Sequence, residues 1–213
     1  MRAEDANAIL RDLCSRVPVI PVLVIHDLDH AVPLAEALVG GGLPVLEVTL
    51  RTDIALEVIR QMASVPGAIV GAGTLLTPDD VSAARDAGAR FGVSPGQSDR
   101  LLDAAERADL PLLAGAATAS EAMFLIERGY NIAKYFPAEP IGGAAALRGL
   151  AGPLPDFWFC PTGGIDLAKA PDYLSMPTVP CVGGSWVAPQ SLLGSADWGG
   201  VQQLSSQAAA LAH

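Results

Sequence analysis

The chain of 213 residues has few basic side chains and almost no lysine. Lys and Arg together number 13 against 23 Asp and Glu, which gives a formal net charge of −10. Lys134 and Lys169 are the only lysines. A protein that grips a nucleic-acid backbone or an anionic membrane surface needs a clustered basic patch, and this sequence has none. We therefore expect neither nucleic acid nor a membrane as a partner.

Cysteine, histidine and long apolar runs are also sparse. Cys14, Cys160 and Cys181 are odd in number and form no CxxC pair, which fits a reducing cytoplasm better than a disulfide framework. The 3 histidines show no HExxH motif or other metal-ligand spacing, so we expect no metal. No apolar run is long enough, and free enough of glycine and proline, to span a bilayer. These absences favour a cytoplasmic protein.

What the chain does have is an alternation of short apolar segments with helical patterns. Eight apolar segments, spaced by about 20 to 25 residues, indicate parallel β/α units. Charged residues make up 17% of the chain, which is low, as expected for a sheet covered by helices. The closed form of this pattern is a (β/α)₈ barrel. An open doubly wound sheet is the alternative, but "GAGTLL" lacks the third glycine of a dinucleotide turn.

The predicted architecture is therefore a single-domain α/β protein, a (β/α)₈ TIM barrel with an extra N-terminal helix. We expect that helix in residues 1–16, the barrel in residues 17–186 and a C-terminal helical segment in residues 187–213. Helices should begin near side chains that accept hydrogen bonds from their first turns. The expected capping residues are Asp29, Thr52, Thr77, Ser98 and Thr118.

Lys134 stands in the apolar run "IAKYFPA", where an ammonium without a partner is costly to bury. Strand alternation puts Lys134 and Phe136 on one face and Tyr135 on the other. If that face is the barrel interior, an apolar wall and the guanidinium of Arg51 favour the neutral amine, which attacks a ketone to form a Schiff base. The alternative is an ammonium paired with Glu47. Lys169, in contrast, is expected on a solvated helix.

The segment "VLEVTLR" places Glu47 and Arg51 on one face of a predicted strand. In a barrel this face points inward, near the carboxyl-terminal mouth where barrel active sites lie. A buried carboxylate is costly unless it is paired, so a structural ion pair between Glu47 and Arg51 is one interpretation. The position at the mouth favours a functional carboxylate.

Two Gly-Gly turns end the seventh and eighth predicted strands, in "CPTGGI" and "CVGGSW". Glycine also marks ordinary tight turns. However, barrels usually hold a phosphate at the loops after these two strands, where backbone N–H groups are free to bind an anion. Thr162 and Ser185 flank the turns and supply hydroxyl donors.

Six motifs, in order from about Val17 to Trp186, resemble those of the 2-keto-3-deoxy-6-phosphogluconate (KDPG) and 4-hydroxy-2-oxoglutarate aldolases. They are "GGLPVLEVTLRT", "VGAGTLLTPDD", "VSPG", "AKYFPAE", "FCPTGGI" and "CVGGSW". The resemblance implies a (β/α)₈ barrel, usually a homotrimer, that cleaves a keto-acid sugar phosphate to pyruvate and glyceraldehyde 3-phosphate. The family works through a lysine Schiff base without a cofactor, and some members also, or instead, split 4-hydroxy-2-oxoglutarate to pyruvate and glyoxylate.

Transferred by position, the resemblance implies that Lys134 is the Schiff-base lysine and Glu47 the general acid/base. The residues implied for the pyruvate carboxylate and its surroundings are Arg51, Thr74, Pro95 and Phe136. The residues implied for the distal hydroxyls and the phosphate are Thr162, Gly163, Gly164, Gly184 and Ser185.

Two positions depart from the family pattern. Tyr135 replaces the usual phenylalanine but is turned away from the site, and Ala117 replaces a serine, so a polar contact there is lost. An aldolase for the galactonate epimer stays open beside the KDPG aldolase, although Thr162 resembles the gluconate type. A sugar-phosphate epimerase or isomerase, in which Lys134 and Glu47 act only as acid and base, is a second alternative. A third is a non-catalytic barrel that binds a phosphorylated metabolite.

Overall fold

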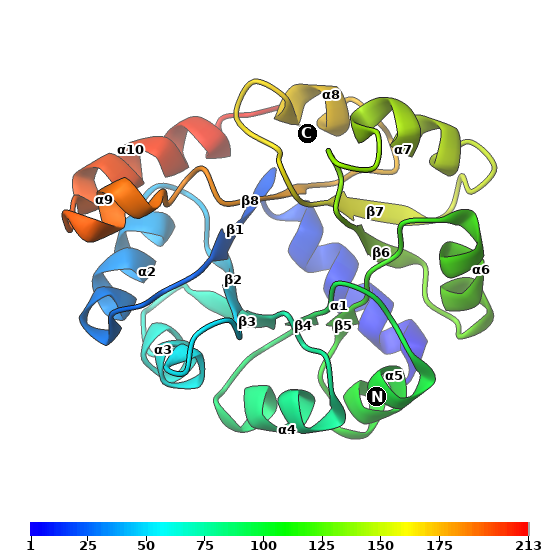
Figure 1. Cartoon of the computed structure of the whole chain (residues 1–213), viewed down its shortest axis with the longest axis horizontal. Helices are drawn as coiled ribbons and strands as arrows, with labels where there is room; N and C mark the ends of the chain where they lie inside the picture. The colour runs from blue at the N-terminus through cyan, green and yellow to red at the C-terminus, as the bar shows by residue number, and fades with distance from the viewer. Residues whose placement is uncertain (213) are drawn as a thin grey trace.

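The computed structural model describes residues 1–212, in which parallel strands close into a barrel surrounded by helices (Figure 1). The strands are β1 (Val19–Leu23), β2 (Val45–Thr49), β3 (Ile69–Gly73), β4 (Gly92–Val93), β5 (Leu112–Leu113), β6 (Ile132–Tyr135), β7 (Trp158–Pro161) and β8 (Val182–Gly184). Hydrogen bonds join them in the order β5-β4-β3-β2-β1-β8 and, separately, β6-β7. Single parallel bridges, Gly115 to Lys134 and Thr162 to Gly183, link the two groups at both gaps. The predicted (β/α)₈ fold is confirmed.

The helices follow the strands on the outside of the barrel, in the order of the chain (Figure 1). They are α1 (Ala3–Ser15), the 3₁₀ turn η1 (Leu28–His30), α2 (Ala31–Gly40), α3 (Ala55–Met62), α4 (Pro78–Asp86), α5 (Asp99–Arg107), α6 (Ala119–Glu127), α7 (Gly143–Ala151), α8 (Ala170–Leu174), α9 (Gln190–Gly194) and α10 (Trp198–Ala209). Within residues 1–212, none of these helices has the length and apolar character needed to cross a membrane.

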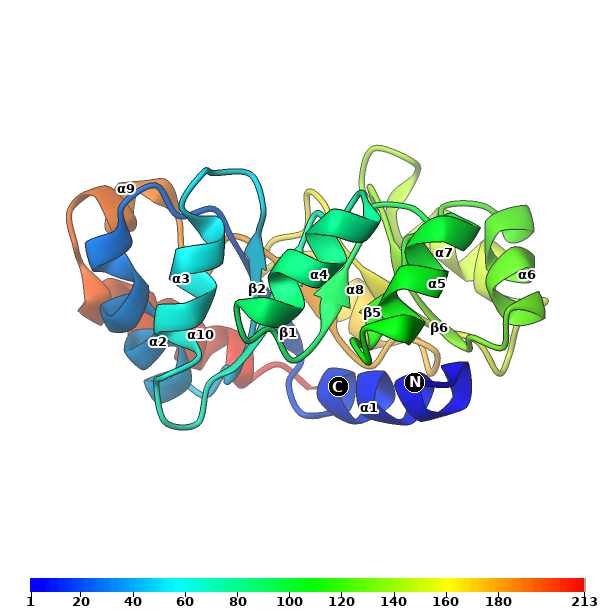
Figure 2. The same cartoon turned by 90° about the horizontal axis from the view of Figure 1, so that it is seen from below.

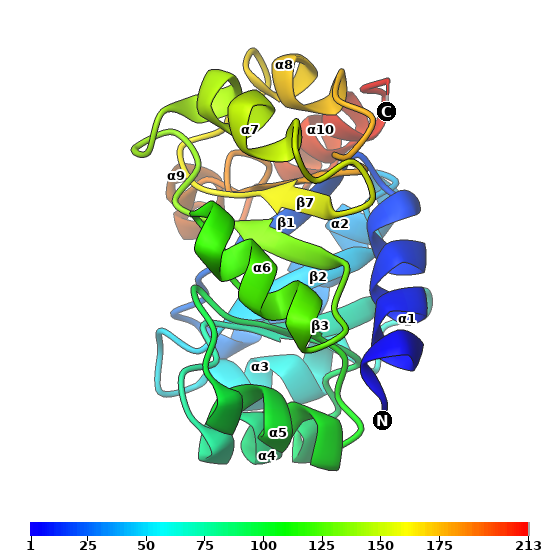
Figure 3. The ribbon, with the colours of Figure 1, turned by 90° about the vertical axis from the view of Figure 1, so that its right-hand side faces the viewer.

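The predicted N-terminal helix is present as α1, which lies across one end of the barrel (Figures 2 and 3). Asn7 donates to the carbonyl of Gly129, and Arg11 donates to Asn131, just before β6 begins. These contacts fix α1 at the amino ends of the strands. The opposite, carboxyl-terminal mouth is therefore free of this helix.

Three of the five predicted caps are confirmed. Thr77, Ser98 and Thr118 each accept a hydrogen bond from the first turn of their helices. The predictions for Asp29 and Thr52 are wrong, because Asp27 caps η1 and the Thr52 hydroxyl binds another loop. Asp27 accepts from the backbone of Asp29, and Thr52 donates to the carbonyl of Ile25 at 2.9 Å instead of capping α3.

Helices α9 and α10 fall in the expected C-terminal helical segment, whose last residue, His213, lies outside the described residues. Helix α10 packs closely on α2. A Cβ at Gly41, which follows α2, would lie 2.4 Å from the Cβ of Ser205. Only glycine allows α10 to approach this closely.

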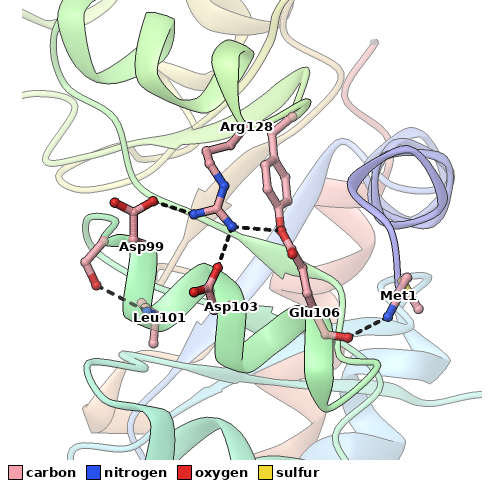
Figure 4. A network of polar contacts seen from close by, with 8 residues as sticks. Met1, Asp99, Leu101, Asp103, Glu106 and Arg128 are labelled. Carbon is pink, nitrogen blue, oxygen red and sulfur yellow. Dashed lines mark hydrogen bonds and ion pairs between the residues drawn. The ribbon is translucent and has the colours of Figure 1, made fainter.

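A surface ionic network joins α5 to the end of α6 (Figure 4). Arg128 contacts Asp99 at 2.5 Å, Asp103 at 2.7 Å and Glu106 at 3.2 Å. The N-terminal ammonium of Met1 donates to the backbone carbonyl of Glu106. Arg128 therefore connects two outer helices on the side of the chain's start, away from the barrel interior.

Candidate functional site

Lys134 and Glu47 meet across the barrel interior, from β6 and β2. The Nζ of Lys134 lies 3.1 Å from Oε1 and 3.5 Å from Oε2 of Glu47. Both residues are buried, with 5% and 3% of their surfaces exposed. Among the described residues Glu47 pairs with this lysine and not with Arg51, so the structural Glu47–Arg51 pair is excluded in this structure. A carboxylate at this distance can accept a proton from the lysine or return it.

Gly73, at the end of β3, provides the space for the carboxylate of Glu47. A Cβ at this position would lie 2.3 Å from Oε1 and 2.7 Å from Cγ of Glu47. Any other residue would therefore displace the side chain that holds Lys134. Gly73 is not among the residues predicted for the site; its signal in the sequence is a glycine at a strand end directly before Thr74.

Arg51 and Thr74 lie together at the carboxyl ends of β2 and β3. The Nε of Arg51 donates to Oγ1 of Thr74 at 3.3 Å. Thr74 has a φ of 64°, which is unusual for a β-branched residue. Such strain persists only where the surroundings fix it, and it is concentrated at functional sites. The strained backbone directs the Thr74 hydroxyl to the guanidinium.

Phe136 lies close to Lys134, and Pro95 is linked to it through Gly115. The Phe136 ring centroid is 5.4 Å from the Lys134 Nζ. The Pro95 carbonyl packs against Gly115, where a Cβ would lie 2.1 Å from that oxygen, and Gly115 pairs with Lys134. Pro95, just after β4, is therefore separated from the lysine on β6 by the strand β5. The structure thus brings Arg51 together with Thr74, and Phe136 together with Lys134.

A cavity of about 450 Å³ opens at this mouth. Its predicted lining residues are Arg51, Phe136, Thr162, Gly163, Gly164 and Ser185. Gly163 and Gly164 have φ values of 109° and 78°, a conformation that other residues rarely adopt. Lys134 and Glu47 are buried and do not line this cavity, and Phe136 connects them to it, because it both lines the wall and contacts the Lys134 ammonium.

Gly184 is not among the residues that line the cavity, and its predicted phosphate contact stays a prediction. The cavity wall contains its neighbours Gly183 and Ser185, whereas a Cβ at Gly184 would lie 1.9 Å from Cζ3 of Trp186. Gly184 therefore makes room for the indole, which itself lines the cavity. Trp186, Val22, Val24 and Gln190 are lining residues that our sequence reasoning missed.

Tyr135 lies on the other face of β6, as alternation predicts. It is buried and packs edge to face on Phe159, with ring centroids 6.4 Å apart. Burial raises the pKa of its phenol. Across residues 1–212 no group of three or more His, Cys, Asp or Glu is arranged to hold a metal ion.

Residues 10–204 match the family model described as "Aldolase: KDPG and KHG aldolase". The 2-dehydro-3-deoxy-phosphogluconate aldolase of Pseudoalteromonas atlantica is 48% identical over 201 residues, which cover 94% of each chain.

Solved structures of KDPG aldolases are also similar to this chain in both sequence and fold. The KDPG aldolase of Zymomonas mobilis ZM4, solved with 3-phosphoglycerate, superposes with a TM-score of 0.94 at 45% identity, over 97% of this chain and 98% of that one. A KDPG aldolase from Legionella pneumophila, solved with pyruvate captured as a covalent carbinolamine, has a TM-score of 0.90 at 42% identity, over 93% and 97% of the two chains.

Proposed function

Because this chain belongs to the KDPG and KHG aldolase family, we propose that Lys134 and Glu47 carry out the aldol cleavage of that family. The chain is a carbon–carbon lyase, a 2-dehydro-3-deoxy-phosphogluconate aldolase that yields pyruvate and glyceraldehyde 3-phosphate. The observation that carries the residue assignment is the buried contact of 3.1 Å between the lysine amine and the carboxylate.

Glu47 first prepares the nucleophile. It accepts a proton from Lys134, and the neutral amine adds to the C2 ketone of the substrate. Loss of water then gives a protonated imine. Because both groups are buried, little water competes for the proton or for the imine.

The imine makes the bond cleavage possible. Glu47 removes the proton of the C4 hydroxyl, the C3–C4 bond breaks, and its electron pair moves into the imine to form an enamine. The aldehyde product leaves, C3 of the enamine is protonated, and water releases pyruvate and the free lysine. Acid/base help of this kind typically contributes about 10²–10⁴ in rate.

The two ends of the substrate are held by different groups. Arg51 and Thr74 bind the pyruvate carboxylate, since the guanidinium supplies a charged donor at the cavity wall. At the other end, the backbone N–H groups of the Gly163–Gly164 turn and the hydroxyl of Ser185 receive the phosphate, with Thr162 beside them. Binding at both ends holds the reacting carbon against Lys134.

The test is a comparison of three substrates in one assay for released pyruvate. We expect the highest kcat/KM with KDPG, a lower value with its galactonate epimer, and measurable cleavage of 4-hydroxy-2-oxoglutarate, which shares the pyruvate half but has no phosphate. A higher value for the epimer would reassign the substrate. Isomerisation of sugar phosphates without pyruvate release would replace the aldolase by an epimerase or isomerase.

We further propose a homotrimer in the cytoplasm. Within residues 1–212, six large apolar residues are solvent-exposed, among them Leu76 at 61% and Met123 at 54%, which supports burial against other copies. The three cysteines are free, which fits a reducing compartment. Light scattering coupled to gel filtration tests the assembly: three times the chain mass supports a trimer, and any other multiple contradicts it.

A further inference from the structure

We propose that Lys169, Glu139 and Tyr173 form a clasp that fixes the Gly163–Gly164 turn for phosphate binding. This inference rests on the proposed function and adds positioning residues to it. Glu139 is the last residue of the "AKYFPAE" motif, and nothing in the reaction described above uses it. Lys169, expected from the sequence to be merely solvated, is the second of the chain's two lysines.

Glu139 is the centre of the clasp. Its Oε1 accepts a hydrogen bond from the Tyr173 hydroxyl at 2.5 Å, and its Oε2 lies 3.0 Å from the Lys169 Nζ. The hydrogen bond from Tyr173, followed by that from Lys169, holds the pKa of Glu139 below its ordinary value. The carboxylate is therefore ionised at neutral pH, and it holds both partners.

The clasp binds the turn directly. Lys169, the residue before α8, donates from its Nζ to the carbonyl of Gly164 at 3.0 Å. The backbone N–H of Glu139 donates to the carbonyl of Gly163 at 3.0 Å. The turn is also packed on Glu139, since a Cβ at Gly164 would lie 2.9 Å from the Glu139 Cβ.

Tyr173, which anchors the clasp, is buried. Tyr173 is 1% exposed, and burial, followed by the contact with Glu139, raises the pKa of its phenol. Its hydroxyl therefore stays protonated and continues to donate. The three residues come from two parts of the chain: Glu139 lies in the loop after β6, whereas Lys169 and Tyr173 belong to α8 and the residue before it. Their contacts therefore join these two parts over the loop after β7.

A phosphate site made of glycines needs such support. Glycine permits the required left-handed conformations but does not enforce them, because it also populates many others. If the peptide after Gly164 rotated, its carbonyl oxygen would face the phosphate and repel it. The bond from Lys169 holds that oxygen, so the N–H groups of the turn remain oriented for an anion.

We expect substitutions in the clasp to weaken phosphate binding while they leave pyruvate binding unchanged. We expect Lys169→Met to raise the KM for KDPG and the inhibition constant of inorganic phosphate, each by about tenfold, with kcat little changed. The pyruvate concentration that gives half-maximal borohydride trapping should stay within about twofold of the wild type. Tyr173→Phe, which removes only the hydroxyl, should shift the two phosphate-dependent constants in the same direction by a smaller factor.

Two variants serve as controls. Lys169→Arg keeps a donor and a charge and should restore most of the affinity. Arg60→Met breaks a similar exposed ion pair, to Glu57 on α3, and should change none of the constants.

Two results would overturn the clasp. One is an unchanged inhibition constant for phosphate in Lys169→Met, and the other is an equal rise for phosphate and pyruvate, which indicates general disruption. If the wild type trapped no pyruvate, the proposed function would fail, whereas the dissociation constant of inorganic phosphate, measured by calorimetry in the wild type and Lys169→Met, would still decide the clasp.

Discussion

The molecule has two ionic centres that differ in burial and in surroundings. Lys134 and Glu47 form an isolated pair inside the barrel, with side chains 7% and 4% exposed. Arg128 lies on the outside with three carboxylates, and its partners are 31% to 69% exposed (Figure 4). The surface centre has more charge contacts than the buried one.

The number of contacts does not indicate which centre matters for activity. Exposed ion pairs are screened by water and contribute little to stability. A buried pair carries a desolvation cost that its attraction often fails to repay, so stability alone does not explain it. The difference between the two centres therefore supports the proposed chemistry at the buried pair and a role in helix attachment for the surface network. Substitutions at each centre should separate the two roles.

The largest effect is expected from Glu47→Gln. The amide has the same shape but cannot accept the proton of Lys134, so kcat for KDPG should fall by about 10²–10⁴-fold. The pyruvate-release assay measures this loss, and circular dichroism checks that the barrel is folded. Glu57→Gln, at an exposed carboxylate of α3, is the matched control and should retain full activity. A kcat for Glu47→Gln within twofold of the wild type would leave the pair a structural role only.

A smaller loss is expected from Gly73→Ala. The new Cβ would lie 2.3 Å from the Glu47 Oε1, so the carboxylate must move although it stays chemically intact. Displacement by about 1 Å costs roughly 10²-fold in rate, and overpacking destabilises by about 1–3 kcal/mol. Rate and thermal midpoint are measured together.

Gly149→Ala provides the comparison for this substitution. Gly149 lies in α7, and a Cβ added there would meet no neighbouring side chain or loop within 4 Å, so alanine should leave the rate unchanged. It should also stabilise the helix slightly. Equal rates for the two alanine variants would show that Gly73 is not needed to position Glu47.

The smallest effect is expected from Arg128→Met. It removes the contacts to Asp99, Asp103 and Glu106, which exposed geometry limits to about 1 kcal/mol in total. For a chain of this size the thermal midpoint should fall by about 2–4 °C while kcat and KM stay constant. The difference from the wild type should shrink in about 1 M salt, since screening already weakens the network. A loss of activity at an unchanged midpoint would contradict the assignment.

The barrel itself is predictable from the sequence, because its cause is local. Alternation within "VLEVTLR" and "IAKYFPA" is sufficient to orient Glu47, Lys134 and Tyr135. Capping is predictable where no tertiary contact competes for the capping side chain, as at Thr77, Ser98 and Thr118. Thr52 fails as a cap because its hydroxyl binds the carbonyl of Ile25, a contact between two loops that becomes possible only after the barrel closes.

The site is predictable in its residue types but not in its distances. Which partner Glu47 takes depends on the geometry across the barrel, and the structure selects Lys134 over Arg51. Gly73 could not be predicted, because its role is to leave space for the Glu47 carboxylate, and no pattern of side chains reveals such a space. The contact between Glu139 and Tyr173 could not be predicted for another reason: the two residues lie far apart in sequence and meet only through the packing of α8.

The most direct test of the central claim is to incubate the protein with pyruvate and borohydride and to map the modified peptide by mass spectrometry. Reduction of an imine leaves pyruvate covalently attached to the amine that formed it. We predict an adduct at Lys134, none at Lys169, and none in Lys134→Met, which should also lose measurable cleavage of KDPG. An active protein that gives no adduct, or that carries it on Lys169, would contradict the account.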